Sequence, residues 1–176
     1  MGLWRCSVKK NDTKRLTVLS LLIAVAMILS YIEAQIPLSV AVPGVKIGLS
    51  NIATVFALYT LGAPAAVAVS VVRVILSSLL FGNFAMMIYS LSGAALALIF
   101  MILTKRSRVF SAIGVSVTGG VMHNAGQVIA AAVMMENAGI AAYVIPLIIS
   151  GTLAGVAVGV ISALLVGRLE GYLKIK

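Results

Sequence analysis

The sequence predicts an all-α integral membrane protein, a single-domain bundle of six transmembrane helices. Of its 176 residues, 62% are hydrophobic and only 10% are charged, whereas soluble domains average about 45–50% apolar and about 25% charged residues. The mean hydropathy is +1.19, and a soluble fold of this size cannot bury so much apolar surface. Because a membrane helix needs about 20 apolar residues, the chain has room for about six helices and no separate soluble domain.

The first helix is expected at about residues 16–36. Basic residues precede it as in a secretory signal, but no small-residue cleavage pattern follows the apolar run. We therefore interpret it as an uncleaved membrane helix. Pro37 and the pair Pro43-Gly44 end it, and the irregular, apolar segment 37–48 is expected to fold back over the protein.

Turn residues and charges separate the five helices that follow. Pro64 suits the first turn of the third helix, and Gly82-Asn83 forms a tight turn after it. A basic loop is expected at residues 105–108 and a small polar patch at residues 136–139. The five expected helices cover about residues 49–61, 64–81, 84–103, 109–135 and 141–166.

The positive charges predict the orientation. The net charge is +9, and the basic residues gather in residues 1–15, 105–108 and 168–176, whereas the other side holds Lys46 and Glu136. Cytoplasmic segments are enriched in Lys and Arg. We therefore expect an even number of helices in the cell membrane with both termini cytoplasmic, and membrane lipid rather than nucleic acid as the surroundings. The expected parts are a basic cytoplasmic tail (1–15), the transmembrane domain (16–169) and a second cytoplasmic tail (170–176).

Small residues recur every four positions along the last helix. Such a stripe lets helices approach closely in lipid, and it serves either internal packing or docking of another membrane protein. The stripe consists of Gly151, Gly155, Gly159, Ala163 and Gly167. The first helix carries a shorter version, Ser20-x-x-x-Ala24, with the same two interpretations.

A few polar side chains interrupt the apolar helices. Such residues are costly at membrane depth and usually face a cavity or one another. Those expected at mid-membrane or towards the outside are Glu33, Lys46, Asn51, Arg73, His123, Asn124 and Gln127. Their common depth predicts one outward-facing ligand site. Lys46 and Arg73 against Glu33 give this site a net positive charge, which suits an anionic or strongly polar head group. The apolar body of the ligand would lie among Phe84, Met86, Met87 and Tyr89.

Each polar residue also has a structural interpretation that the sequence leaves open. These interpretations are an ion pair between Arg73 and Glu33, hydrogen bonds between helices from His123 and Gln127, snorkelling of Lys46 to the headgroups and capping of the second helix by Asn51.

The residues that common enzyme chemistries need are missing. The sequence has no phosphate-binding loop motif. Its one aspartate, Asp12, lies in the N-terminal tail, so no carboxylate cluster can hold Mg²⁺ for a diphosphate substrate. One histidine, His123, and one remote cysteine, Cys6, make neither a catalytic triad nor a zinc site. We therefore expect neither an enzyme nor a metal or other cofactor.

Two motifs carry a family resemblance. Residues 43–51 read PGVKIGLSN and residues 116–127 read SVTGGVMHNAGQ. With these motifs, the chain resembles, over about residues 16–169, the family labelled heptaprenyl diphosphate synthase component I, also called the Gx transporter family. That family in turn looks like the six-helix S components of energy-coupling factor (ECF) transporters. This resemblance gives Ser20 and Ala24 a role in docking and segment 37–48 a role as a lid, although S components typically have alanine where Ser20 stands.

The resemblance implies a substrate-binding subunit of an ATP-driven importer. Such a subunit captures a small ligand at the outer face and works with a transmembrane coupling subunit and ATPases. The family label suggests a quinone or isoprenoid precursor as the ligand. Two other functions stay open, namely a non-catalytic membrane subunit or anchor of heptaprenyl diphosphate synthase and a stand-alone secondary transporter.

Overall fold

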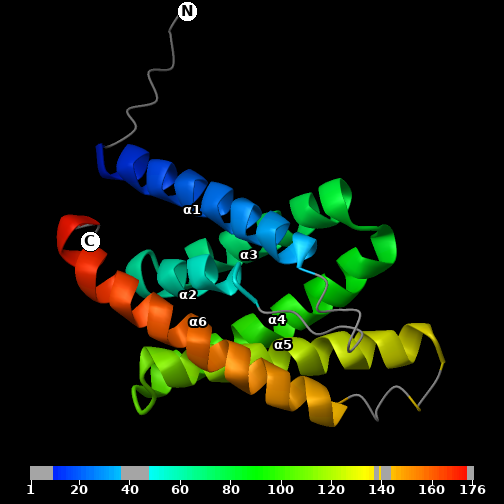
Figure 1. Ribbon diagram of the computed structural model, residues 1–176. Coiled ribbons are helices and arrows are strands. Elements are labelled where there is room, and N and C mark those ends of the chain that lie inside the picture. Colours follow the sequence, from blue (N-terminus) through cyan, green and yellow to red (C-terminus); the bar gives the residue numbers. More distant parts are fainter. Residues whose placement is uncertain (1–9, 37–47, 137–138, 140–143, 174–176) are drawn as a thin grey trace, which may run out of the picture.

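The computed structural model describes residues 10–36, 48–136, 139 and 144–173, and the described part of the chain contains six helices and no strand (Figure 1). The predicted all-α class is therefore confirmed. The helices are α1 (Lys10–Gln35), α2 (Asn51–Thr60), α3 (Ala63–Phe81), α4 (Phe84–Ser107), α5 (Ala112–Met134) and α6 (Val144–Leu173).

Four of the described helices are long and apolar enough to cross a membrane, over Asp12–Gln35, Ala63–Phe81, Phe84–Ser107 and Val144–Leu169. α2 has only 10 residues, or about 15 Å, which is half of the roughly 30 Å of bilayer hydrocarbon. α5 has 23 residues, but polar residues and glycines interrupt its centre. All six predicted helices exist, while six membrane crossings remain a prediction. Large apolar side chains such as Leu79, Phe84 and Val133 are exposed, as lipid contact requires.

The helix ends differ from the predicted ones mainly where charged residues lie next to an apolar run. α4 continues through Lys105 and Arg106, expected as loop residues, and ends at Ser107, after which Arg108 caps it with a φ of 57°. α1 begins at Lys10 and α6 continues to Leu173. Lys, Arg and Glu are good helix formers, and cations are favourable in a last helical turn. Hydropathy alone therefore underestimates the length of these helices.

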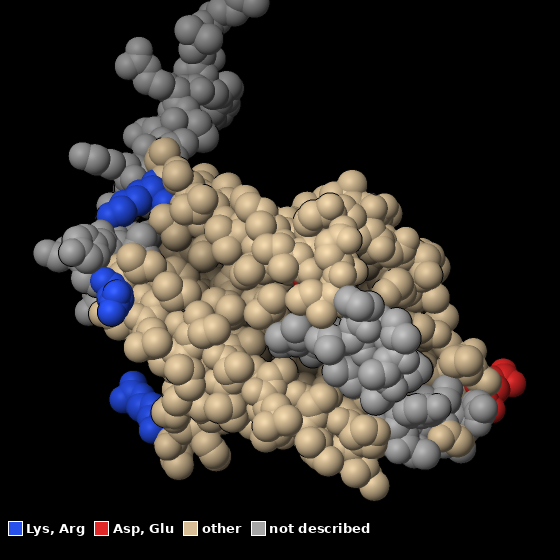
Figure 2. Space-filling view, viewed as in Figure 1, with Lys and Arg blue, Asp and Glu red and all other residues tan. Residues whose placement is uncertain are grey.

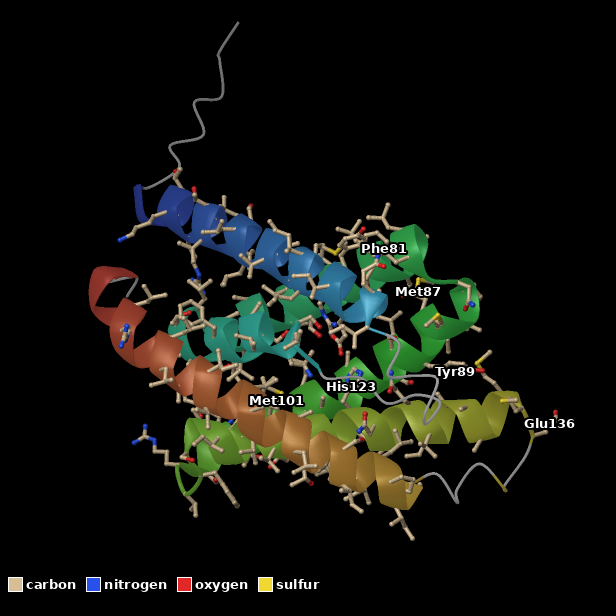
Figure 3. All side chains as sticks on the ribbon, viewed as in Figure 1. Phe81, Met87, Tyr89, Met101, His123 and Glu136 are labelled. Atoms are coloured by element: carbon tan, nitrogen blue, oxygen red, sulfur yellow. The ribbon has the colours of Figure 1, made fainter. Side chains whose placement is uncertain are left out.

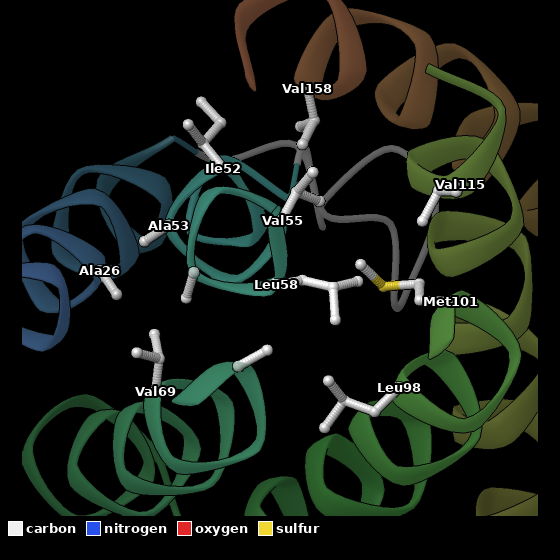
Figure 4. Packing of buried hydrophobic residues seen from close by; sticks show 12 residues of the cluster. Ala26, Ile52, Ala53, Val55, Leu58, Val69, Leu98, Met101, Val115 and Val158 are labelled. Atoms are coloured by element: carbon white, nitrogen blue, oxygen red, sulfur yellow. The ribbon is translucent and has the colours of Figure 1, made fainter. Parts of the chain in front are cut away.

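Helix α2 forms the centre of the bundle. All its residues from Ile52 to Leu58 are buried. Figure 4 shows Val55 and Leu58 of α2 surrounded by buried side chains of the other helices. Those neighbours include Val69 of α3, Leu98 and Met101 of α4, Val115 of α5 and Val158 of α6. A half-length helix in this position begins inside the protein, so its N-terminal end can contribute to an internal site.

Two cations hold the other end of α2. The Arg15 side chain of α1 donates to the Leu61 carbonyl oxygen (2.9 Å). The Lys105 ammonium of α4 donates to the Leu58 carbonyl oxygen (2.5 Å) and lies 4.7 Å from the centre of the Tyr59 ring. Positive charge is favourable at a helix C-terminus. The basic residues near the bundle end thus also fix α2 within the fold.

These cations belong to one end of the bundle. The start of α1, the end of α6 and the α4–α5 connection lie at that end (Figure 1), and the visible Lys and Arg atoms gather there in Figure 2. An acidic side chain lies at the opposite end, where Figure 3 labels Glu136. This arrangement agrees with an even number of crossings. The cytoplasmic orientation of this end stays a prediction.

We expect Lys105→Met to lower the melting temperature in detergent by about 3–6 °C, since a hydrogen bond from a charged group contributes about 1.5 kcal/mol or more. Arg106→Met is the matched control, because Arg106 is exposed in the same helical turn. Thermal unfolding of the two purified variants measures the difference. Equal melting temperatures would show that the contacts of Lys105 with α2 contribute nothing to stability.

The glycine stripe of α6 packs against α5. A Cβ at Gly151, Gly155 or Gly159 would lie 2.8, 2.6 or 2.8 Å from the nearest α5 atom, whereas nothing lies within 4 Å of one at Gly167. These distances are too short for any side chain, so the two helices meet backbone to backbone. Internal packing, one of the two predicted roles, is therefore confirmed for the first three glycines of the stripe.

Candidate ligand site

A tight turn leads into α2. Gly48 has a φ of +73°, a region that side-chain-bearing residues rarely adopt. Its carbonyl oxygen accepts from the Asn51 amide (2.9 Å), and its own amide donates to Glu33 Oε1 of α1 (2.5 Å). Glu33 therefore fastens the turn to the end of α1, and the first residues of α2 take a defined place in the bundle interior.

Arg73 approaches the same turn from α3. It is 9% exposed, and its Nη1 donates to the Ser50 hydroxyl (2.5 Å). Among the described residues its Nε has no hydrogen-bond partner. Glu33 attracts Arg73 electrostatically, but the two side chains hydrogen-bond to different groups, Gly48 and Ser50. Together they form a network around the first turn of α2.

A cavity of ≈ 30 Å³ lies between the start of α2 and helices α5 and α6. Its polar lining comes from Asn51 of α2 and from Ser116, His123 and Asn124 of α5, and glycines supply much of the rest. Binding sites for whole drug-sized ligands measure about 300–1,000 Å³. The cavity of the described residues therefore accommodates one small polar group of a ligand.

Two neighbouring side chains of α5 reach this cavity in different ways. Asn124 is 6% exposed, and its amide nitrogen donates to the Leu147 carbonyl oxygen of α6 (2.6 Å). This bond ties α6 to the site. His123 is half-buried and lies in the interior, with Met101 and Tyr89 to either side of it in Figure 3. One α5 turn thus supplies both a helix-to-helix link and a titratable ring at the cavity.

Gln127 lies one turn beyond His123 and faces α4. A Cβ on Gly93 of α4 would lie 2.8 Å from Gln127 Cγ and 2.7 Å from the His123 carbonyl oxygen. Gln127 is not among the described residues that line the cavity. The four residues expected around the apolar body of the ligand differ in their exposure. Phe84 and Met86 are exposed, whereas Met87 and Tyr89 are half-buried.

The structure divides the predicted site into two connected parts. Asn51, His123 and Asn124 line the cavity, while Glu33 and Arg73 contact the residues just before Asn51. Lys46 and most of segment 37–48 lie outside the described residues. The predicted binding role of all these residues, and the predicted lid, stay predictions.

Two serines were missed by the sequence analysis. Ser50 occupies the N-cap position that was considered for Asn51. Its side chain accepts no capping bond from α2, and its hydroxyl accepts a hydrogen bond from Arg73. Ser116 lines the cavity. Its spacing of two helical turns from His123 places both on one helix face, and this was the available signal.

The predicted docking motif lies on the outer surface of α1. Ser20 and Ala24 are both exposed, whereas Ala26, two residues further, is fully buried. The motif is therefore not used for packing within the described part of the bundle. Its role in binding a partner remains a prediction.

An apolar helical bundle with a small polar cavity and a buried arginine inside it has the features of a helical membrane protein with an internal site. The chain belongs to the family described as heptaprenyl diphosphate synthase component I, whose family model matches residues 22–165. The predicted resemblance to this family is confirmed. No curated protein and no solved structure gave a match.

Proposed function

We propose that this protein is the membrane-embedded substrate-binding subunit of an ATP-driven importer of the ECF type. The observation that carries the proposal is the gathering of polar side chains from α1, α2, α3 and α5 at the buried start of α2. Polar groups inside a membrane bundle are costly and usually functional.

The electrostatics support an anionic or acceptor-bearing head group. The N-terminal end of a helix carries about half a positive charge, and the start of α2 lines the cavity. Arg73 adds a full positive charge next to it, which Glu33 partly offsets. A small amphipathic compound, such as a quinone or isoprenoid precursor, would place its polar head here and its apolar part among the surrounding side chains.

The energy for import has to come from partners, because the sequence lacks a phosphate-binding loop motif. Ser20 and Ala24 are small and exposed one helical turn apart, which permits close approach of a helix from a coupling subunit. In this proposal the chain binds and hands over its ligand without chemical change. It is therefore not an enzyme, and its other partners are two ATPases.

The family description favours a second candidate. Its words, heptaprenyl diphosphate synthase component I, imply a synthase with more than one component. The chain would then be a non-catalytic membrane subunit, with the basic end around Lys105 and Arg106 contacting the soluble component. The two candidates differ in the protein that accompanies the chain and in whether a small molecule is retained.

Purification of the tagged protein from its native membranes in mild detergent tests the proposal. We expect mass spectrometry to find a transmembrane coupling subunit, ATPases and a retained small molecule. Ala24→Leu should lose these partners, whereas Val25→Leu, at an exposed neighbouring position, should keep them. Recovery of a prenyl diphosphate synthase instead would favour the second candidate. Uptake by vesicles that contain this chain alone would indicate a stand-alone transporter and overturn the proposal.

A further inference from the structure

The Ser116 hydroxyl is a buried polar group that the fold leaves unused. Ser116 is 4% exposed and lines the cavity. Among the described residues its hydroxyl has no hydrogen-bond partner. Unlike the hydroxyl of Ser162, its oxygen is not sealed inside the fold. A ligand atom in the cavity can therefore accept a hydrogen bond from Ser116.

The size of the cavity limits what can bind beside Ser116. Its volume of ≈ 30 Å³ is more than a single water needs. It is nevertheless a small space, and the two oxygen atoms that a carboxylate carries on one carbon fit it.

The walls of the cavity cannot easily retreat to admit a larger group. Gly120 and Gly151 both line it, and a Cβ on Gly120 would lie only 2.5 Å from the Gly151 carbonyl oxygen. Backbone packed against backbone cannot adjust by changing a rotamer. The close contact of α5 and α6 therefore fixes this wall of the cavity.

The charges near the cavity favour a single negative charge. Arg73 and Glu33 contact the residues just before Asn51, and Glu33 partly offsets the charge of Arg73. The remaining positive charge adds to the partial positive charge of the helix N-terminus. Among the described residues that line the cavity, the side-chain amide of Asn51 and the hydroxyl of Ser116 are neutral donors. A group with three negative charges would remain largely uncompensated in an apolar bundle, and burial of such charge is strongly unfavourable.

We propose, on the basis of the ligand-binding role argued above, that this cavity binds the carboxylate of a monoanionic amphiphile. The Ser116 hydroxyl donates a hydrogen bond to one carboxylate oxygen, and the side-chain amide of Asn51 donates to the carboxylate from the start of α2. His123 forms the side of the site next to α4. The apolar tail of the ligand leaves the cavity and lies among apolar side chains.

Equilibrium binding of radiolabelled decanoate to the purified protein in nanodiscs tests this assignment, with empty nanodiscs subtracted. We expect saturable binding that unlabelled decanoate displaces and farnesyl diphosphate does not. Ser116→Ala should weaken it about tenfold, the loss expected for one hydrogen bond to a charged acceptor. Ser162→Ala is the matched control, because Ser162 on α6 is also buried with an unpaired hydroxyl but does not line the cavity.

The outcomes separate this inference from the importer proposal. Absence of saturable decanoate binding, displacement by farnesyl diphosphate, or equal affinity of the Ser116 and Ser162 variants would each overturn the carboxylate assignment. A melting temperature for each variant shows that it is folded. Binding is measured without any partner, so a failure to recover ATPases would count against the importer alone. Partner recovery without carboxylate binding would count against the carboxylate alone.

Discussion

Replacing Arg73 with leucine is expected to lower the affinity for an anionic ligand by about 30-fold or more. The substitution removes a full positive charge that hydrogen-bonds to Ser50, directly before the cavity residue Asn51. It also leaves Glu33 as an unbalanced negative charge at the same turn. Both effects disfavour an anion. Decanoate binding in nanodiscs, or retention of the co-purified compound, measures the loss.

The double variant Arg73→Leu with Glu33→Gln separates binding from folding. Arg73 is buried and interacts electrostatically with Glu33, so removing Arg73 alone leaves the Glu33 charge unbalanced, whereas removing both charges is often nearly neutral. We therefore expect the single variant to melt at a lower temperature and the double variant to recover most of that loss. Ligand affinity should stay low in the double variant. Recovery of affinity together with stability would assign Arg73 a structural role only.

A large loss of stability is also expected for Gly159→Leu. A Cβ at Gly159 would lie 2.8 Å from the Ile113 Cα of α5, and a leucine would push the two helices apart along the stripe. Such overpacking costs about 1–3 kcal/mol or more, which corresponds to a melting temperature lower by about 5–10 °C. Gly159 does not line the cavity, so the effect is on packing rather than on ligand contacts.

Gly167→Leu is the matched control, two turns along the same stripe, where nothing lies within 4 Å. Its melting temperature should stay within about 1 °C of the wild type. Gly159→Ala should fall between the two leucine variants and covers the case in which Gly159→Leu does not fold. Equal stability of all three variants would contradict the close packing of α5 on α6.

The sequence by itself determined the class of the protein and its helices. Apolar composition requires lipid contact, and the turn residues place the starts of three helices within two residues of Asn51, Ala63 and Phe84, where these helices begin. The glycine stripe of α6 was visible as a four-residue repeat, and the family was identifiable from local motifs. All these features depend on residues close together along the chain, so pattern and propensity are enough to find them.

Only the tertiary structure decided which polar residues line the cavity and which ones bind neighbouring helices. The Arg73–Ser50 and Asn124–Leu147 hydrogen bonds each join residues that are 23 positions apart, and the cavity requires α2, α5 and α6 together. The sequence grouped Gln127 with His123 by helical spacing, but Gln127 faces α4. It missed Ser116, whose exposure to a cavity depends on the glycines of another helix. Which face of a helix meets which neighbour is set by the packing of the whole bundle, and no local pattern contains that information.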